Sequence, residues 1–350
     1  MIVFRADGNS HIGMGHIMRC LSIADAAKMS GEDSVFILSS DDCKGVVSSR
    51  GYEVSVLNSD YSKMEPGDIL PALEVYEPAI VFVDSYFVTP EYMKCAHDAC
   101  CHMGCKLIYV DDRCYFPYGC DVLLNYNIFG KKTDYEELYL GNTEPLFLLG
   151  TSYTPLRTEF QKSYMRIIAG AAQNVLISTG GADTEHLTID IVQEAALCPD
   201  YTFHFVVGMM NSDRITILKL SESYENIVVH ENVKRMDELM LSCDVAVSAA
   251  GSTLYELCAT GTPTITYVLA DNQIPAAKEF DAQGIIKNCG DIREMGNKEL
   301  AKCLVEEVVS LAEDHDERKR ISEIMCTVVD GKGAERILKS VRELKRNNVK

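Results

Sequence analysis

The sequence predicts an α/β protein built from two doubly wound, Rossmann-like domains. Three observations support this fold class. Short β-rich apolar segments alternate with helical ones, the alternation restarts after a turn-rich connection near residue 154, and a glycine-rich turn follows the first strand of each half. At 350 residues the chain is long enough for two domains of ordinary size. We expect an N-terminal domain over 1–153 and a C-terminal domain with a helical tail over 154–350.

The composition is that of a globular protein, with 47% hydrophobic and 24% charged residues. The 33 basic and 52 acidic residues give a net charge of −19, which disfavours general attraction to nucleic acid or anionic lipid. No apolar run approaches the roughly 18 residues that a membrane span needs. Arg5 and Asp7 lie where a signal peptide would be apolar. We therefore expect a cytoplasmic protein without membrane insertion and without a nucleic-acid partner.

In the first half, each strand leads into a helix or a turn, as in a parallel sheet with helices on both faces. The run at 79–84 is almost entirely apolar, which is typical of a strand buried on both faces. The expected strands are 2–6, 34–39, 53–57, 79–84, 106–111 and 122–125, and the expected helices begin at His16, cover 44–50 and 69–76, and end at Gly104.

The turn after the first strand carries the candidate catalytic residue, His16. A helix opens at His16, and the positive end of its peptide dipoles disfavours the imidazolium, so the neutral ring can accept a proton from water. Arg19 lies one turn further on the same face and can hold a carboxylate or phosphate. We expect Gly13, Gly15 and Arg19 to bind substrate. The alternative is a tight turn in which His16 only marks the helix start.

Two further loops follow strands that end at the same sheet edge as His16. Asp84 can orient or charge-stabilise a histidine, or it can simply cap the next turn. Tyr86 can position a sugar ring. We expect the carboxylates of Asp111 and Asp112 to be solvated loop charges.

Cysteine and histidine gather between residues 95 and 105, but paired Cys-x-x-Cys knuckles are missing from this segment. Most of the segment has the pattern of an amphipathic helix. We expect ordinary thiols here, with a zinc site as the alternative. In a reducing compartment, thiols of this kind stay unpaired.

Residues 143–153 are interpreted as an interdomain connection that ends at the turn-prone Thr154 and Pro155. Arg157 follows, where it can neutralise a diphosphate or form a surface ion pair. A helix is expected to begin near Glu159. The alternation then restarts, with expected strands at 174–178, 202–207, 227–230, 244–248 and 263–268 and an expected helix at 235–242.

The second half has its own candidate ligand loops. Gly180 and Gly181 form a turn at a strand's carboxyl end. Gly251 and Ser252 precede a helix start, where backbone N–H groups favour phosphate. Thr253 and Glu256 have capping-box spacing, and Glu256 can also accept from ribose hydroxyls. Asn272 and Gln273 follow the next strand. The charged helical segment from 299 to 342 carries no catalytic signal and is expected to cover the second sheet, with its last helix crossing back to the first domain.

Five motifs occur in order along roughly residues 1–290. They are Gly13-x-Gly15-His16-x-x-Arg19 with Leu21 and Ala24, Val83-Asp84-Ser85-Tyr86, Leu156-Arg157 with Glu159-Phe160, Gly251-Ser252 with Glu256, and Asn272-Gln273. Together they resemble the UDP-2,4-diacetamido-2,4,6-trideoxy-β-L-altropyranose hydrolases of pseudaminic acid biosynthesis. Related proteins of spore-coat polysaccharide synthesis share much of this pattern.

The resemblance implies a GT-B fold and hydrolysis of the bond between the anomeric carbon and its oxygen, with release of UDP. The histidine matching His16 would activate water, with no metal and no cofactor. By position, Arg157, Glu256 and Asn272 would contact substrate or nucleotide, with Tyr86 near the sugar. The backbone around Val233 and Met236 would frame the uracil.

Two other functions stay open at this point. A GT-B glycosyltransferase would use His16 to deprotonate a sugar or lipid hydroxyl in place of water. A nucleotide-sugar sensor would bind UDP without needing His16. Nothing in the sequence demands more than a monomer.

Overall fold

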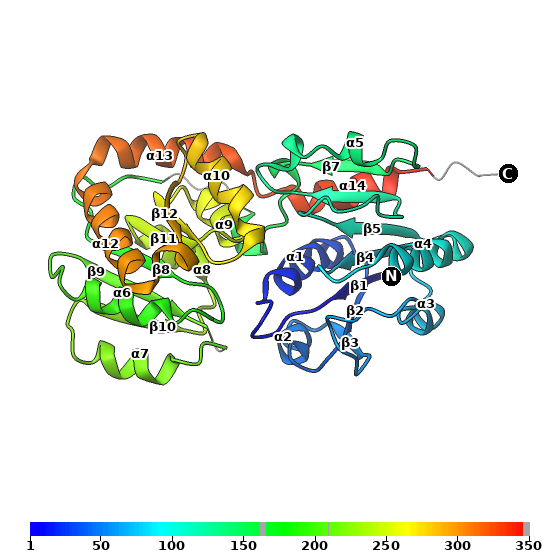
Figure 1. Ribbon diagram of the computed structural model, residues 1–350, viewed down its shortest axis with the longest axis horizontal. Helices are drawn as coiled ribbons and strands as arrows, with labels where there is room; N and C mark the ends of the chain where they lie inside the picture. Colours follow the sequence, from blue (N-terminus) through cyan, green and yellow to red (C-terminus); the bar gives the residue numbers. More distant parts are fainter. Residues whose placement is uncertain (162–165, 209, 346–350) are drawn as a thin grey trace. The chain divides into compact units, whose positions relative to one another are not determined.

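The computed structural model describes residues 1–161, 166–208 and 210–345, and the chain divides into two compact units (Figure 1). Unit 1 consists of Met1–Asn9, Met14–Thr158 and the segment from Lys332 onward. Unit 2 consists of Ser10–Gly13 and Glu159–Gly331. The change from one unit to the other thus falls five residues after the expected boundary at 153. The segment from Lys332 onward belongs to unit 1, in agreement with the expectation that the last helix crosses back to the first domain, so the second unit ends at Gly331 and not at 350.

The described strands of unit 1 form a seven-stranded sheet in the order β3-β2-β1-β4-β5-β6-β7, and each neighbouring pair is parallel. This is the order of a doubly wound fold, as the sequence predicts. The strands are β1 (Ile2–Ala6), β2 (Ser34–Leu38), β3 (Glu53–Val56), β4 (Ile80–Asp84), β5 (Lys106–Val110), β6 (Val122–Asn125) and β7 (Leu146–Leu149).

The core of unit 1 lies on the central strands, where every residue of β1, β2 and β4 is buried. Phe4 pairs in register with Phe36 on one side and with Phe82 on the other, and both ring pairs stack with centroids 5.0 Å apart. Three aromatic rings thus lie side by side on one face of the sheet. Because every residue of these strands is buried, both of their faces must be largely apolar, which explains their nearly continuous hydrophobic sequence.

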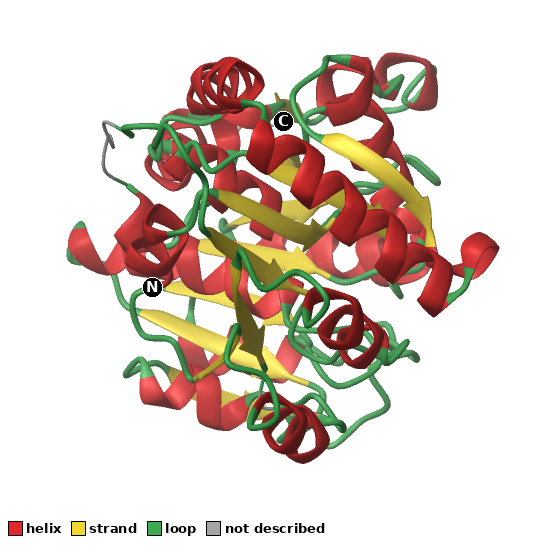
Figure 2. Cartoon of the chain, turned by 90° about the vertical axis from the view of Figure 1, so that its left-hand side faces the viewer, coloured by secondary structure: helices red, strands yellow, loops and turns green. Residues whose placement is uncertain are grey.

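Helices flank the strands (Figure 2). The helix α4 shows how the local sequence sets its ends. Thr89 accepts a hydrogen bond from the Tyr92 backbone at 3.1 Å, Pro90 occupies the first turn, and Gly104 ends the helix in the left-handed region at φ 77°. The helices of unit 1 are α1 (Gly15–Met29), α2 (Lys44–Ser49), α3 (Leu70–Tyr76), α4 (Pro90–Met103), α5 (Tyr135–Leu138) and α14 (Gly333–Glu343).

Unit 2 contains a six-stranded parallel sheet in the order β10-β9-β8-β11-β12-β13. It repeats the doubly wound plan of unit 1. Its strands are β8 (Asn174–Ser178), β9 (Thr202–Val207), β10 (Ile227–Glu231), β11 (Val245–Ala249), β12 (Thr264–Val268) and β13 (Lys287–Asp291). Its helices are α6 (Leu187–Ala195), α7 (Arg214–Ser221), α8 (Met236–Ser242), α9 (Thr253–Thr260), α10 (Ile274–Ala282), α11 (Ile292–Met295), α12 (Asn297–Glu313) and α13 (His315–Val328).

The helical tail divides between the units. Within unit 2, α12 packs on α6 and α13 packs on α9, so these helices cover the second sheet as expected. The helix α14 packs on α1 in unit 1 and buries Ala334, Ile337, Leu338 and Val341. A side chain at Gly333 would meet the backbone of Thr154, because a Cβ there would lie 2.1 Å from the Thr154 carbonyl oxygen. Glycine therefore permits this close approach.

Three expectations need correction. Residues 143–153 are not only a connection, because they include β7, an edge strand that pairs with β6. The strand β13 was not predicted, and its polar and glycine-containing sequence explains why. Near Glu159 the structure shows the short 3-10 helix Thr158–Phe160, and the rest of the expected helix falls on 162–165, outside the described residues. Among the described residues, no helix combines the length and apolar character that crossing a bilayer requires.

Arg318 on α13 offers a test of how the helical layer of unit 2 is held. Its side chain is 1% exposed, and its guanidinium donates to the carbonyls of Leu311 and Ala312, at the end of α12, and to those of Ala169 and Gly170. Replacement by alanine removes the donor from the carbonyls of Leu311 and Ala312, which belong to buried residues. We expect Arg318→Ala to lower the free energy of unfolding by about 3 kcal/mol in urea denaturation.

The exposed neighbour Lys319 provides the control. Lys319→Ala should change the free energy of unfolding by no more than about 0.5 kcal/mol. Equal stability of the two variants would show that Arg318 does not hold α12 and α13 together.

Candidate functional site

The candidate site of unit 1 lies at the switch point of its sheet. The strand β1 stands between β2 and β4, so the chain leaves β1 toward one side of the sheet and reaches β4 on the other. Loops that leave neighbouring strands in opposite directions open a crevice at their carboxyl ends. Ala6, the last residue of β1, pairs with Asp84, the last residue of β4. The fold therefore brings the loop that carries His16 next to Asp84.

The loop after β1 is anchored at its start by a buried ion pair. The Asp7 carboxylate accepts from Arg5 Nη1 at 2.5 Å, from the Ser39 backbone at 2.6 Å and from the Ser39 hydroxyl at 2.9 Å. Arg5 is 0% exposed. These bonds tie the end of β1 to the end of β2. Gly13, with φ at 72°, then gives the left-handed turn that leads into α1.

His16 is buried at the second position of α1, and its ring orientation is fixed by Asp84. The Nδ1 atom of His16 lies 2.6 Å from Asp84 Oδ1. An ionised carboxylate only accepts hydrogen bonds, so Nδ1 carries the proton and donates it to Asp84. In the neutral ring, the lone pair is then on Nε2. That atom has no hydrogen bond to any residue that the structure describes, and this is the arrangement that a general base needs.

Arg19 completes the cluster from the next turn of α1. Its Nε and Nη2 atoms donate to the two Asp84 oxygens, each at 2.5 Å, and its Nη1 donates to the Tyr126 hydroxyl at 3.0 Å. Although burial opposes the charged form, the Arg19 guanidinium and the His16 ring hold the pKa of Asp84 well below its usual range. The carboxylate that Arg19 binds is therefore the protein's own. The contact of Arg19 with substrate stays a prediction, and in the structure its guanidinium binds Asp84 and Tyr126.

Tyr86 links a second carboxylate, that of Asp112, to the cluster of His16, Arg19 and Asp84. Its ring meets the His16 ring edge to face, with centroids 4.5 Å apart and planes at 76°. Its hydroxyl donates to Asp112 Oδ2 at 2.8 Å, and the Arg113 guanidinium lies 4.3 Å from the centre of its ring. The sequence reasoning placed Asp112 at this sheet edge but treated its carboxylate as a solvated charge. Its loop follows β5, the neighbour of β4.

The expectation that Asp111 and Asp112 are solvated is wrong for both. Asp111 is 3% exposed, and its Oδ1 atom accepts from the Arg113 backbone at 3.1 Å and from the Tyr118 hydroxyl at 3.0 Å. Its Oδ2 atom accepts from the Cys114 backbone at 2.9 Å and from the Tyr135 hydroxyl at 2.7 Å. Four donors compensate the burial of this charge. Asp112 is partly buried and bonded to Tyr86.

The amino-terminal turn of α1 is open to an anion. Met14 at the N-cap provides no side-chain hydrogen bond, and the first turn contains no acidic residue. The free N–H groups and the helix dipole therefore keep their positive potential beside Gly15 and His16.

In unit 2, the switch point lies between β8 and β11. Gly180 and Gly181 follow β8, and Gly251 and Ser252 follow β11. The predicted capping box needs correction. Ser252 is the N-cap, with φ −60° and ψ −23°, so α9 already begins at Thr253 and Glu256 lies one position beyond the capping-box site. The Ser252 side chain makes no cap hydrogen bond, and the N–H groups of Leu254 and Tyr255 donate to the carbonyls of Gly251 and Ser252, each at 3.1 Å.

The other residues expected to bind nucleotide or substrate lie on neighbouring loops. Asn272 and Gln273 follow β12, and a Cβ at Gly251 would lie 4.0 Å from Gln273 Nε2, so these two loops meet. Val233 and Met236 follow the edge strand β10, with Met236 as the first, buried residue of α8. Arg157 lies in unit 1, half-buried, just before the short helix at Thr158–Phe160.

The cysteine-rich segment forms α4 and the loop after it. Cys100 and Cys105 are buried and Cys101 is exposed, so the thiols lie on different sides of the helix. Among the described residues, no group of three or more histidine, cysteine, aspartate or glutamate side chains is placed to hold a metal ion.

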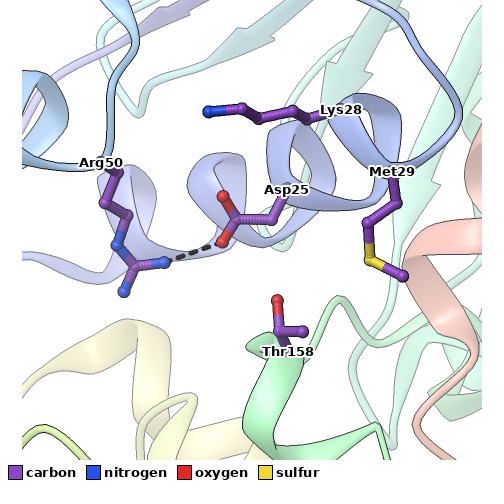
Figure 3. A pocket seen from close by; sticks show the side chains of 5 residues that line it. All are labelled: Asp25, Lys28, Met29, Arg50 and Thr158. Atoms are coloured by element: carbon purple, nitrogen blue, oxygen red, sulfur yellow. Dashed lines mark hydrogen bonds and ion pairs between the residues drawn. The ribbon is translucent and has the colours of Figure 1, made fainter.

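A surface hollow of about 480 Å³ in unit 1 is lined by none of the expected site residues. Figure 3 shows it beside the later turns of α1, with Asp25, Lys28 and Met29 on the helix and Arg50 and Thr158 around it. Its carboxylate is already occupied, because Asp25 accepts from Arg50 at 2.9 Å and from the Tyr52 hydroxyl at 2.5 Å. The convergent polar groups of unit 1 lie at the other end of α1, around His16.

Comparison with known proteins agrees with the fold described above. Residues 156–322 match the glycosyltransferase family 28 C-terminal domain. An uncharacterized protein of Methanocaldococcus jannaschii, MJ1062, is 25% identical over 286 residues, which are 78% of this chain and 56% of that protein. The chain thus spans little more than half the length of this relative.

Two bacterial relatives have descriptive names. A Campylobacter jejuni protein named UDP-2,4-diacetamido-2,4,6-trideoxy-beta-L-altropyranose hydrolase is 25% identical over 256 residues, 71% of this chain and 87% of that protein. The spore coat polysaccharide biosynthesis protein SpsG of Bacillus subtilis is 25% identical over 175 residues, 49% of this chain and 50% of SpsG. Among solved structures, MurG of Acinetobacter baumannii is similar in fold, with a TM-score of 0.65 at 11% identity, covering 98% of this chain and 99% of MurG.

The buried cluster predicts how the stability of unit 1 depends on Asp84 and on pH. Asp84→Asn leaves Arg19 buried without its counter-ion, and we expect it to lower the free energy of unfolding at pH 7 by about 3 kcal/mol. The pKa of Asp84 is lowered in the folded chain, so its contribution is complete above the unfolded pKa near about 4 and is lost as the pH falls further. The difference between wild type and Asp84→Asn should therefore shrink below about pH 4.

Urea denaturation at several pH values measures this difference. The control is Asp98→Asn on α4, whose carboxylate is 65% exposed and pairs with the exposed Lys94, so its effect should stay within about 0.5 kcal/mol. A difference for Asp84→Asn that does not depend on pH would contradict the assignment of an ionised, Arg19-bound carboxylate.

Proposed function

We infer that this chain, which belongs to the UDP-2,4-diacetamido-2,4,6-trideoxy-β-L-altropyranose hydrolase family and has the GT-B fold, hydrolyses a UDP-linked sugar at the anomeric C–O bond. The proposed substrate is the UDP-linked diacetamido trideoxy altrose of pseudaminic acid biosynthesis. The observation that carries the proposal is the buried His16–Asp84 pair, which fixes a histidine with its second nitrogen available to take a proton.

In the proposed step, a water molecule gives its proton to His16 Nε2 while its oxygen attacks the anomeric carbon. The bond from that carbon to the diphosphate oxygen breaks, and UDP leaves with the electron pair. Asp84 holds the ring through Nδ1 and faces the positive charge that forms on it, while Arg19 keeps Asp84 ionised. The step as proposed uses no metal ion and no cofactor.

Unit 2 is the proposed site for UDP. The positive end of the α9 dipole, at an N-cap without a side-chain hydrogen bond, is proposed to attract the phosphates, and Gly251 permits the backbone to approach them. Glu256 in the first turn of α9 is proposed to accept from the ribose hydroxyls, and the backbone near Val233 and Met236 to contact the uracil. Gly180, Gly181, Arg157, Asn272 and Gln273 are proposed as further contacts to nucleotide or substrate.

The second candidate is a glycosyltransferase, which the match to the family 28 C-terminal domain favours. The same base and the same nucleotide site would then serve an acceptor hydroxyl in place of water. The two functions differ in one measurable result, because only a hydrolase releases free sugar when no acceptor is present.

The test is to incubate the purified protein with the UDP-linked diacetamido trideoxy altrose, without an acceptor, and to follow UDP and free sugar by NMR. Release of both in equal amounts supports the hydrolase.

The variant His16→Asn tests the proposed base. It should lower turnover by about 10² to 10⁴, because the positioned base is lost, and should leave the Kd for UDP nearly unchanged in calorimetry. His102→Asn, at an exposed position on α4, is the matched control. Full activity of His16→Asn would refute the proposed base.

Gly251 permits a test of the nucleotide site that does not disturb the fold. A Cβ at this position meets no atom closer than 4.0 Å, and the backbone needs no left-handed angle. If phosphate approaches this backbone, the added methyl group must interfere with it. We expect Gly251→Ala to fold with unchanged stability and to raise the Kd for UDP at least about tenfold, a loss of about 1.4 kcal/mol.

Gly208 gives the contrasting case, because a Cβ there would lie 2.2 Å from the Gly181 carbonyl oxygen. Gly208→Ala should therefore lower stability as well as binding. An unchanged Kd for UDP in Gly251→Ala would exclude close approach of the diphosphate to this loop.

A further inference from the structure

Two adjacent aspartates after β5 have opposite surroundings. Asp111 accepts four hydrogen bonds, two on each oxygen, from hydroxyl and backbone donors within unit 1. Both of its oxygens are thus satisfied within the fold, and its role is to hold the loop after β5. Among the residues that the structure describes, Asp112 receives one hydrogen bond, from the Tyr86 hydroxyl to Oδ2.

The second oxygen of Asp112, Oδ1, is buried and meets no donor among the residues that the structure describes. A buried acceptor without a donor costs about 1–3 kcal/mol, and native proteins contain few of them. Burial also raises the pKa of the Asp112 carboxyl, with Arg19 acting in the opposite direction. An uncompensated cost of this kind is typical of a functional site.

Asp112 belongs to the same group of side chains as the proposed base. Its partner Tyr86 is held by the His16 ring at 4.5 Å and by the Arg113 guanidinium at 4.3 Å, in addition to the bond to Asp112. The strands β4 and β5, which position Asp84 and Asp112, are direct neighbours in the sheet. The unpaired oxygen is therefore tied to the proposed reaction centre through a single side chain, Tyr86.

We propose that Asp112 binds the sugar, its carboxylate accepting a hydrogen bond from a hydroxyl or acetamido N–H group of the ring. This inference rests on the proposed function, because it assigns a partner within that site. The sugar is the fitting partner because it supplies neutral donors, whereas a second carboxylate beside Asp84 repels the diphosphate. The residue as a whole is only partly buried, and the terminal torsion of aspartate is broad, so a small rotation presents an oxygen to a ligand.

The same contact contributes to the rate. The sugar gains positive charge as its bond to the diphosphate breaks, so its hydroxyl and N–H groups become stronger donors. A carboxylate that accepts from one of them binds the transition state more tightly than the substrate. Loss of this acceptor should therefore lower kcat/KM for the UDP-sugar without changing the affinity for UDP alone.

The test compares Asp112→Asn with wild type in UDP release from the UDP-linked diacetamido trideoxy altrose and in calorimetric binding of UDP. Asparagine can keep the bond from Tyr86 but places an N–H donor where the sugar donor would lie. We expect kcat/KM to fall about 5- to 150-fold, which corresponds to the loss of one buried hydrogen bond, and the Kd for UDP to stay within about twofold. An unchanged kcat/KM would overturn the proposal.

The variant Tyr86→Phe distinguishes two roles of Asp112, binding of the sugar and support of the Tyr86 side chain. If Asp112 only held Tyr86, then Asp112→Asn would cost nothing further in the Tyr86→Phe background. We expect a further loss of kcat/KM in that background, and its absence would overturn the proposal. Asp111→Asn is the structural comparison, and it should lower the unfolding midpoint in urea far more than Asp112→Asn does.

If wild type releases no free sugar, the proposed hydrolysis fails, and Asp112 is tested by binding alone. The ratio of the Kd for UDP to the Kd for the same UDP-sugar then measures the sugar contacts. A smaller ratio in Asp112→Asn than in wild type supports the inference. An unchanged ratio, or no preference of wild type for the UDP-sugar, overturns it.

Discussion

The ionised carboxylate of Asp84, buried between β4 and α1, is the constraint on which the rest of unit 1 depends. A charge without exposure to water needs a counter-ion and a full set of donors. Arg19 supplies the charge and two hydrogen bonds, and His16 supplies a third. Because both come from the first turns of α1, the start of this helix must lie directly against the end of β4. The carboxylate that positions α1 is thus also the group that sets the histidine tautomer.

The two units use the same topological position with different chemistry. In unit 1 the switch point holds a network of side chains, in which Tyr126 extends the cluster to β6. In unit 2 the loops at the switch point are rich in glycine, and the N-cap of α9 makes no side-chain hydrogen bond. Side-chain networks suit proton transfer, and exposed backbone N–H groups suit phosphate. Two copies of one fold can in this way serve one reaction, with proton transfer assigned to one copy and phosphate binding to the other.

Much of this arrangement could be predicted from the sequence, because it depends on strand ends. The alternation of strands and helices identified the carboxyl edge of each sheet, on which His16 and Asp84 lie in unit 1 and Gly251 lies in unit 2, and this step needs only local patterns. The distinction between Asp111 and Asp112 could not be predicted, because it depends on which distant tyrosine hydroxyl reaches which carboxylate. The polar strand β13 was missed for a related reason, since its pairing with β12 outweighs its weak β propensity.

The position of α14 has a consequence for the order of folding. This helix belongs to unit 1 but is synthesised after all of unit 2, and its side chains cover α1. On the ribosome, unit 2 is therefore complete in sequence while the surface of α1 that α14 covers is still bare. The nascent first unit must carry this exposed surface through the synthesis of the second, which makes α1 a natural contact for a chaperone.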